Sequence, residues 1–294
     1  MSMFCHQCQE AAKGTGCTVR GVCGKDETVS NLQDVLLYAL KGLAYVATEG
    51  RRAGVVEPAV GKALYEGLFA TITNANFDKD VFVSRIREMI TLREELKKKL
   101  AAKGHVLPEK RPACVSFHAN TEQEMLDTWT AASFLAIENV DVRALRSLVI
   151  FGLKGMAAYV EHAETLGKSD AGVIEFMERA LSATVNDTLD AETLTALVLE
   201  TGKFGVDAMA LLDGANTGAY GNPEPTVVQL GVRKNPGILI SGHDLKDLEE
   251  LLDQTKGTGV DVYTHGEMLP AHYYPAFKKY DNFVGNYARL VETG

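Results

Sequence analysis

Residues 32–44, LQDVLLYALKGLA, and residues 145–157, LRSLVIFGLKGMA, are two versions of one pattern, and this pattern decides the fold. The two segments align at a constant offset of 113 residues and share a Leu-Lys-Gly string. The same offset aligns Ala70-Thr71-Ile72 with Ala183-Thr184-Val185. A constant offset over separate segments predicts two copies of one structural unit.

Each copy is predicted to form a three-helix bundle, because apolar residues recur at helical spacing. In the first helix of the first copy these residues include Leu32, Leu36, Leu40 and Leu43. One additional helix, Thr121–Ile137, is expected after the first copy. The other expected helices of the two copies span Pro58–Asn74, Lys79–Ala102, Ala171–Asn186 and Ala191–Leu212.

The pattern changes after residues 214–225, which are rich in Gly, Asn and Pro and are typical of a linker. Gly237–Ser241 and Val260–Tyr263 read as short strands on either side of an amphipathic helix, Leu245–Gln254. Strands joined through a helix are expected to be parallel. We therefore predict a mainly α protein. Its two duplicated bundles lie in a helical domain of residues 1–222, followed by a truncated, Rossmann-like α/β domain of residues 223–294.

Four of the five cysteines lie within the first 23 residues. Cys5, Cys8, Cys17 and Cys23 have the spacing C-x2-C-x8-C-x5-C, and glycines between them allow the backbone to wrap tightly. Four thiolates in one loop can bind zinc or an iron–sulfur cluster. Only the first pair is closely spaced, which favours iron–sulfur over zinc, with zinc as the alternative. Cys114 is predicted to be a buried structural residue.

Polar residues follow both predicted strands. His243 comes after the first strand and Glu267 after the second, so parallel strands would bring them to the same edge of the sheet. Imidazole and carboxylate together are common ligands of iron. The alternative is that Asp244 caps the following helix and His243 only packs beside it.

Composition and charge exclude several classes of protein. The chain has 294 residues, of which 23% are charged, and a net charge of −9. An acidic chain without a basic run is not expected to bind nucleic acid. No apolar run is long enough to span a membrane, and no signal peptide is visible, so we expect no membrane association and a cytoplasmic location.

Several long strings resemble the hybrid cluster protein family, also called prismane proteins or hydroxylamine reductases. The resemblance covers residues 3 to about 287, and the cysteine spacing is similar to the subgroup that holds a [4Fe–4S] cubane. The strings are Phe4-Cys5-His6-Gln7-Cys8-Gln9-Glu10, Ile240-Ser241-Gly242-His243-Asp244-Leu245 and Tyr263-Thr264-His265-Gly266-Glu267-Met268-Leu269-Pro270.

The resemblance implies an iron–sulfur oxidoreductase that reduces hydroxylamine to ammonia, with a link to nitric oxide and nitrosative stress. It implies that Cys5, Cys8, Cys17 and Cys23 hold the cubane. His243 and Glu267 would be two ligands of a second, hybrid iron–sulfur–oxygen cluster, where the chemistry occurs. No catalytic residue is expected beyond the hybrid-cluster ligands. The implied partners are a small-molecule substrate, hydroxylamine or nitric oxide, and a redox protein that donates electrons.

The sequence departs from the family in length. Family members are considerably longer, and no cysteine follows Cys114, although the hybrid cluster needs further sulfur ligands. The resemblance stops at Tyr287. We interpret residues 288–294 as the product of a frameshift, natural or a sequencing error, with deliberate truncation as the alternative. We expect this chain alone neither to assemble the hybrid cluster nor to reduce hydroxylamine at the family's rate. The alternatives are a [4Fe–4S] electron-transfer fragment and a zinc-stapled helical interaction module.

The remaining histidines receive simpler predictions. His6 is expected beside the cluster or in solvent, and His162 at the surface or at a helix end. His265 and His272 are expected to line the same cleft as His243.

Overall fold

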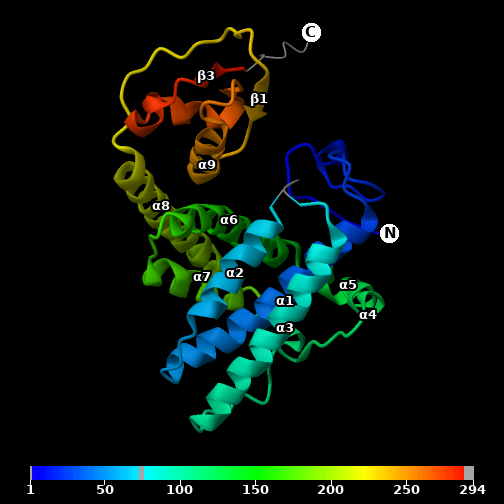
Figure 1. The fold of residues 1–294 in the computed structure, drawn as a ribbon. Coiled ribbons are helices and arrows are strands. Elements are labelled where there is room, and N and C mark those ends of the chain that lie inside the picture. The colour runs from blue at the N-terminus through cyan, green and yellow to red at the C-terminus, as the bar shows by residue number, and fades with distance from the viewer. Residues whose placement is uncertain (1, 73–75, 288–294) are drawn as a thin grey trace. The chain divides into compact units, whose positions relative to one another are not determined.

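The computed structural model describes residues 2–72 and 76–287 (Figure 1). The predicted end of the second helix at Asn74 and the proposed frameshift segment 288–294 lie outside these residues. The chain divides into two compact units. Unit 1 comprises Met1–Glu161 and Asp170–Met209, and unit 2 comprises His162–Ser169 and Ala210–Gly294.

The helices of unit 1 confirm the duplication. Helices α1 (Glu27–Arg52) and α6 (Val140–Thr165) both contain 26 residues, and their bounds differ by the offset of 113. Helices α2 (Pro58–Ala70) and α7 (Ala171–Ala183) both contain 13 residues at the same offset. The third members are α3 (Lys79–Ala102) and α8 (Ala191–Tyr220), of which α8 continues into unit 2.

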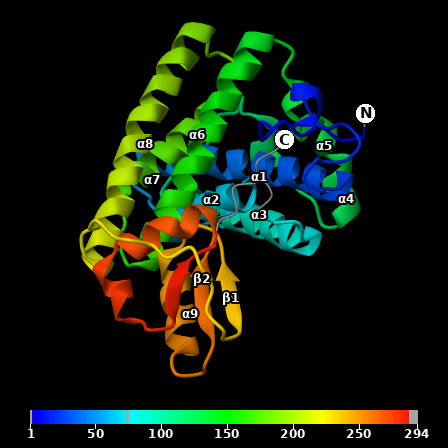
Figure 2. The same cartoon turned by 90° about the horizontal axis from the view of Figure 1, so that it is seen from above.

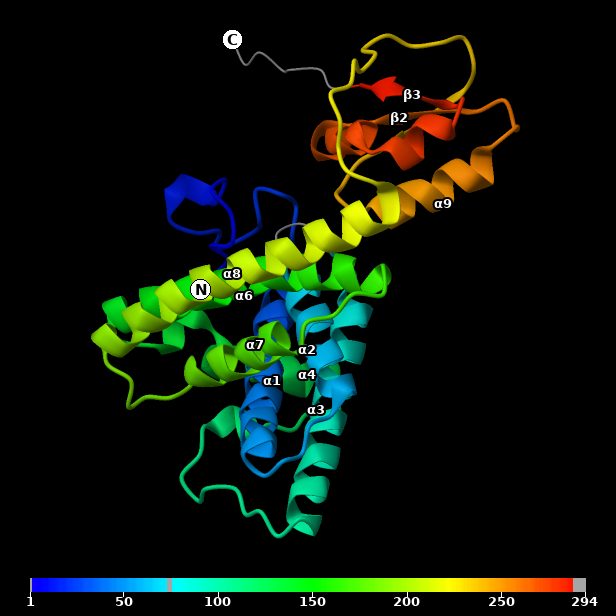
Figure 3. The same ribbon diagram turned by 90° about the vertical axis from the view of Figure 1, so that its left-hand side faces the viewer.

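Helix α1 is the central element of unit 1. It begins after Asp26, whose side chain accepts a hydrogen bond from the amide of Val29 and so satisfies a free donor of the first turn. It packs against α2, α3 and α7 (Figure 3). Buried apolar side chains from both copies form one continuous cluster. The two bundles therefore share a core instead of burying two separate ones.

The additional helix predicted over residues 121–137 is wrong as a single element. The segment forms α4 (Glu122–Asp127), α5 (Trp129–Ala132) and a 3-10 turn, η3 (Phe134–Ala136). Thr121 and Glu124 form a capping box that starts α4. The break comes at Ser133, whose backbone is extended (φ −61°, ψ 141°) and whose side chain accepts from the amide of Leu135. Two further 3-10 turns are η1 (Ala12–Gly14) and η2 (Ala113–Ser116).

Unit 2 contains a small parallel sheet. The predicted strand–helix–strand unit is confirmed as β1 (Gly237–Ile240), α9 (Leu245–Thr255) and β2 (Asp261–Thr264). Two 3-10 segments follow, η4 (Gly266–Tyr273) and η5 (Pro275–Lys279). A third strand, β3 (Phe283–Asn286), pairs in parallel with β2 and was not predicted, because four residues interrupted by a glycine carry little strand signal.

The strands lie in the order β1-β2-β3 (Figure 2). The core of unit 2 gathers Leu248 and Leu252 of α9, Val262 of β2 and Phe277 of η5. Strand β1 is exposed, and the side chain of Leu239 lies 53% in solvent. Within the described residues, β1 is therefore an unpaired edge of the sheet.

The predicted domain boundary between residues 222 and 223 follows the end of α8, whereas the second segment of unit 2 begins within that helix, at Ala210. None of the helices in the described ranges has the length and apolar character needed to cross a membrane.

Candidate metal centres

The N-terminal loop is closed by its own backbone. Cys5 and Cys17 form an antiparallel bridge in which the amide of Cys5 donates to the Cys17 carbonyl at 3.0 Å and the Cys17 amide donates to the Cys5 carbonyl at 2.8 Å. Cys17 is buried, Cys5 and Cys8 are partly buried, and Cys23 is exposed. All four cysteines have free thiols. The loop therefore gathers a soft donor set that suits iron or zinc.

Hydrogen-bond donors and a cation lie near the sulfurs. The amide of Ala12 donates to Cys17 Sγ at 3.4 Å, and Lys25 Nζ lies 4.0 Å from Cys5 Sγ. A side chain at Gly21 would bring its Cβ within 3.1 Å of Cys23 Sγ, so the missing side chain leaves that sulfur free. Hydrogen-bond donors of this kind tune the sulfur ligands of iron–sulfur centres.

The sulfurs are not arranged as in a tetrahedral zinc site. Within the described ranges, no three of the cysteine Sγ atoms lie within 4.8 Å of one another. Four sulfurs at 2.3 Å from one zinc ion would lie about 3.8 Å apart.

Two buried lysines brace the loop. Lys25 Nζ donates to Gln33 Oε1 at 2.6 Å, and Lys154 Nζ donates to Gln7 Oε1 at 2.9 Å and to the carbonyl of Thr71 at 3.3 Å. Burial lowers the pKa of Lys154 to about 7, against the attraction of the Asp34 carboxylate. Sequence analysis missed both lysines. A lysine in an amphipathic helix is normally exposed, and for Lys154 the shared Leu-Lys-Gly string was the available signal. Lys25 precedes α1 and carries no such signal.

His6 lies between the cysteines Cys5 and Cys8 but is not exposed to solvent. Its ring packs 4.0 Å from the ring of Phe134. Burial, followed by the charges of Lys154 and Arg143, lowers the pKa of His6 to about 4. The neutral ring therefore packs beside the cysteine loop, and its position next to a cluster stays a prediction.

The structure brings the second predicted pair together. His243 follows β1 and Glu267 follows β2, and His243 Nε2 lies 3.4 Å from Glu267 Oε2. Their side chains are 65% and 78% exposed. Asp244 caps α9 by accepting from the amides of Lys246 at 2.7 Å and Asp247 at 3.4 Å. The capping predicted by the alternative interpretation is thus also present, and it leaves the imidazole of His243 free to reach Glu267.

The two other histidines of this region differ. His265 Nδ1 lies 3.3 Å from Ser241 Oγ, at the same edge of the sheet. His272 is buried, pairs with Thr264 Oγ1 at 2.8 Å and stacks on Phe283. Burial lowers its pKa to about 4. The prediction that His272 lines a cleft with His243 is wrong, because β3, which was not predicted, covers it.

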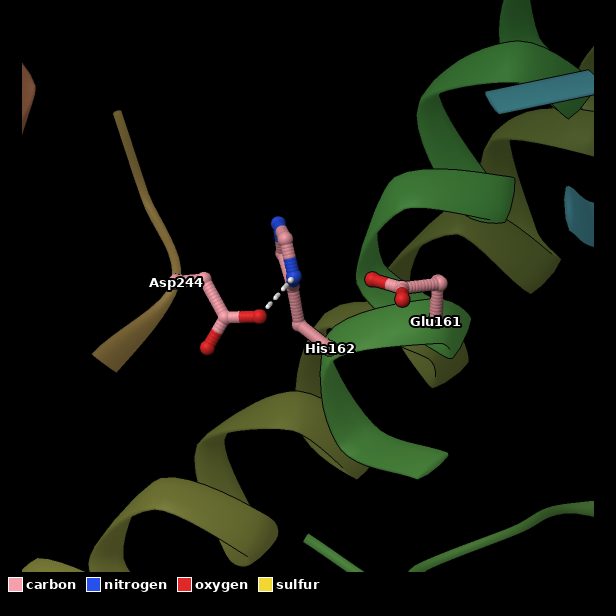
Figure 4. Close-up of side chains that lie close together, drawn as sticks. All are labelled: Glu161, His162 and Asp244. Carbon is pink, nitrogen blue, oxygen red and sulfur yellow. Dashed lines mark ion pairs between the residues drawn. The ribbon is translucent and has the colours of Figure 1, made fainter. Parts of the chain in front are cut away.

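His162 is not a simple surface residue. Its Nδ1 lies 3.3 Å from Asp244 Oδ2, and only 13% of its side chain is exposed (Figure 4). Burial acts to raise the pKa of Asp244, but the hydrogen bond from His162 and the amides of α9 hold it below its ordinary value. Sequence analysis missed this pair, because its members are far apart in the chain.

Cys114 is buried as predicted. Burial raises the pKa of its thiol to about 11, so it is a neutral, inert residue.

The fold places the chain in the class of mainly helical proteins with a small parallel α/β unit. The model of the Prismane/CO dehydrogenase family matches residues 3–293, and the chain belongs to this family.

The chain is similar to several hydroxylamine reductases. It is 60% identical over 287 residues to that of Desulfitobacterium hafniense (strain DSM 10664 / DCB-2), covering 98% of this chain and 52% of that protein. The hydroxylamine reductase of Clostridium perfringens (strain 13 / Type A) is 57% identical over 288 residues with the same coverage. The chain thus spans about half the length of the curated relatives it matches.

A solved structure, carbon monoxide dehydrogenase IV from Carboxydothermus hydrogenoformans, aligns with 90% of this chain and 40% of its own at 16% identity. The TM-score is 0.25, which is too low to support an argument about the fold.

Proposed function

We propose that this chain carries the electron-entry site of a hydroxylamine reductase, a [4Fe–4S] cubane on Cys5, Cys8, Cys17 and Cys23. The observation that carries the proposal is the cysteine loop, closed by the Cys5–Cys17 bridge and supplied with donors to sulfur. The 60% identity to a protein named hydroxylamine reductase supports the same conclusion.

The residues around the loop fit an anionic cluster. When bound, the cubane would supply one-electron transfer from a redox protein. Lys25 and Lys154 place positive charge beside the loop, and the amide of Ala12 donates to a sulfur ligand. These groups favour the more negative, reduced state of the centre. The exposed Cys23 is the point at which a redox partner would approach.

His243 and Glu267 are proposed as two ligands of the hybrid iron–sulfur–oxygen cluster. An imidazole and a carboxylate 3.4 Å apart, exposed at the carboxyl ends of parallel strands, can share one iron ion. The reduction of hydroxylamine consumes two electrons and two protons and yields ammonia and water. We assign this reaction to a protein with the complete cluster, because two ligands cannot hold several irons.

Metal analysis of the anaerobically purified chain tests the cubane. We expect iron and acid-labile sulfide in equal amounts matching one cubane, with one reducible signal in electron paramagnetic resonance. Cys17→Ser should lose the iron and the signal, whereas the matched control Cys114→Ser should keep both. Zinc without sulfide, or iron retained in Cys17→Ser, would overturn the proposal.

Electron transfer without turnover is the second candidate, favoured by the difference between the two sites. The cysteine loop offers four ligands, whereas the sheet edge offers two. An assay that follows the oxidation of a reduced viologen by hydroxylamine distinguishes the two candidates. Turnover that is lost in both His243→Ala and Glu267→Gln supports the reductase in this chain. A filled cubane with no turnover assigns electron transfer to it.

A further inference from the structure

A small internal cavity lies between the two duplicated helices α1 and α6. Its volume is about 50 Å³. Three pairs of equivalent positions, each separated by the repeat offset, line it: Asp34 with Ser147, Leu37 with Ile150, and Lys41 with Lys154. The cavity therefore lies where equivalent faces of the two copies meet, and the N-terminal loop and the segment of α5 and η3 complete its lining.

The lining has an excess of positive charge. Lys41, Lys154 and Arg146 all contribute to it and are all more than nine-tenths buried. Asp34 supplies the one carboxylate among its lining residues, and its Oδ2 already accepts a hydrogen bond from Trp129 Nε1 at 2.9 Å. Three basic side chains therefore face one carboxyl group that is already bonded, and the thiol of Cys5 also lines the cavity.

Two of the donors lack an acceptor. Lys41 makes no hydrogen bond or ion pair within the part of the chain that the structure describes. Arg146 uses Nη2 to reach the carbonyl of Asn186 at 2.9 Å and Asp187 Oδ1 at 3.0 Å, but its buried Nε has no partner. A buried charge without a partner costs several kcal/mol, on the order estimated for buried ions. Such donors indicate a ligand that the protein chain does not supply.

We propose that this cavity binds a small inorganic anion, held by Lys41 Nζ and Arg146 Nε, with the hydroxyl of Ser147 as a further donor. Because a water molecule needs roughly 10–15 Å³ of such volume, the cavity has room for a few water-sized groups. A halide, nitrite or nitrate ion fits this space. A nucleotide or a phosphate ester does not.

Cys5, His6 and Gln7 of the cysteine loop line the cavity as well. The proposed donors Lys41, Arg146 and Ser147 lie on α1 and α6, outside that loop. The charged or ionisable neighbours that act on Lys41 are Cys114, Asp34 and Arg146, whereas those of Lys154 include Cys5. Lys154 is also already bonded to Gln7 and to the carbonyl of Thr71. The inference therefore goes beyond the proposed redox function and does not depend on it.

The chain contains its own reporter for this site. Trp129 is the single tryptophan of the sequence, and it is bonded to Asp34, which lines the cavity. We would titrate the purified protein with sodium bromide and sodium nitrate at constant ionic strength, balanced with gluconate. Tryptophan fluorescence and the unfolding temperature would both be followed. A bound anion raises the unfolding temperature in a concentration-dependent way, because it binds only the folded state.

The variants are Lys41→Met, Lys41→Arg and, as a matched control, Lys98→Met at an exposed position of α3. The unchanged protein and Lys98→Met should show the same saturable response. Lys41→Met should bind at least ten times more weakly, and Lys41→Arg should recover binding. Circular dichroism and iron content of every variant separate loss of the anion site from misfolding or loss of the cluster.

Crystals soaked in bromide give an independent readout, with an anomalous peak expected beside Lys41 Nζ. A response that does not saturate, an equal affinity in Lys41→Met, or a peak elsewhere would each overturn the proposal. Failure of this test would leave the metal analysis of the cysteine loop unaffected.

Discussion

Helices α1 and α6 have the same length and a related sequence, but their surroundings differ. Val35 in α1 is fully buried, whereas its counterpart Leu148 in α6 is 53% exposed. A Cβ at Gly42 would overlap the carbonyl of Cys114, whereas Gly155 has nothing within 4 Å. One pattern therefore produced a central helix in one copy and a peripheral helix in the other. Duplication preserves the helix, and tertiary packing decides how much of it is buried.

The two equivalent lysines, Lys41 and Lys154, also differ in their surroundings. Lys154 has two acceptors, Gln7 and the carbonyl of Thr71, while Lys41 has none within the described residues. One copy of the lysine braces the cysteine loop, and the other faces the cavity.

The largest expected difference between the copies is at the glycines. Gly42→Ala should destabilise unit 1 by about 3 kcal/mol, because the backbone of Cys114 cannot rotate away from the added methyl group. Gly155→Ala should stabilise it by about 0.5 kcal/mol, as alanine does in an open helix position. Urea unfolding followed by Trp129 fluorescence measures both. Equal effects would show that the two helices are packed alike.

A smaller difference between the copies is expected in how stability depends on pH, because Asp34 carries a carboxyl group and its counterpart Ser147 does not. Burial raises the pKa of Asp34 to about 6 from 3.8, so the folded chain keeps a proton that the unfolded chain has lost between these values. The free energy of unfolding should therefore fall by about 1–2 kcal/mol as the pH rises from about 4 to 6.

Asp34→Asn should remove this slope while keeping an acceptor for Trp129. Urea titrations at several pH values provide the measurement. An unchanged slope in the variant would assign it to other groups.

Equal effects on stability are expected at Thr71 and Thr184, where the two copies make the same hydrogen bond. Thr71 Oγ1 donates to the Leu68 carbonyl at 2.8 Å, and Thr184 Oγ1 donates to the Leu181 carbonyl at 2.7 Å. Both threonines are buried and end equivalent helices. Thr71→Val and Thr184→Val should each cost about 1 kcal/mol. Urea unfolding measures the loss of unfolding free energy in each variant. Two losses that differ by more than twofold would contradict this equivalence.

The smallest expected effect is on the reduction potential of the cluster, which should respond differently to substitution of Lys154 and of Lys41. In the cluster-loaded protein, Lys154→Met removes a cation beside the loop and should make the reduction potential more negative by tens of millivolts, where 59 mV is about a tenfold change for one electron. Lys41→Met should shift it less, because Lys41 is not bonded to the loop. Potentiometric titration followed by electron paramagnetic resonance checks both. A larger shift in Lys41→Met would reverse the assignment.

Sequence reasoning succeeded where the signal was local or topological. Helical periodicity predicted α1 and α6, and the parallel strand–helix–strand pattern predicted that His243 and Glu267 would meet at one sheet edge. It failed at the break in residues 121–137, where Ser133 turns the chain. It also missed β3, and for that reason it misplaced His272.

The sequence by itself determined the duplication, the helices and the gathering of four cysteines in one short loop, because these depend on spacing along the chain. The tertiary structure decided which copy is central, which lysine finds an acceptor, and that His162 pairs with Asp244. Burial and pairing depend on neighbours that are distant in sequence, and two copies of one pattern meet different neighbours. The cavity between α1 and α6 exists for the same reason, since equivalent faces meet there without matching in shape or charge.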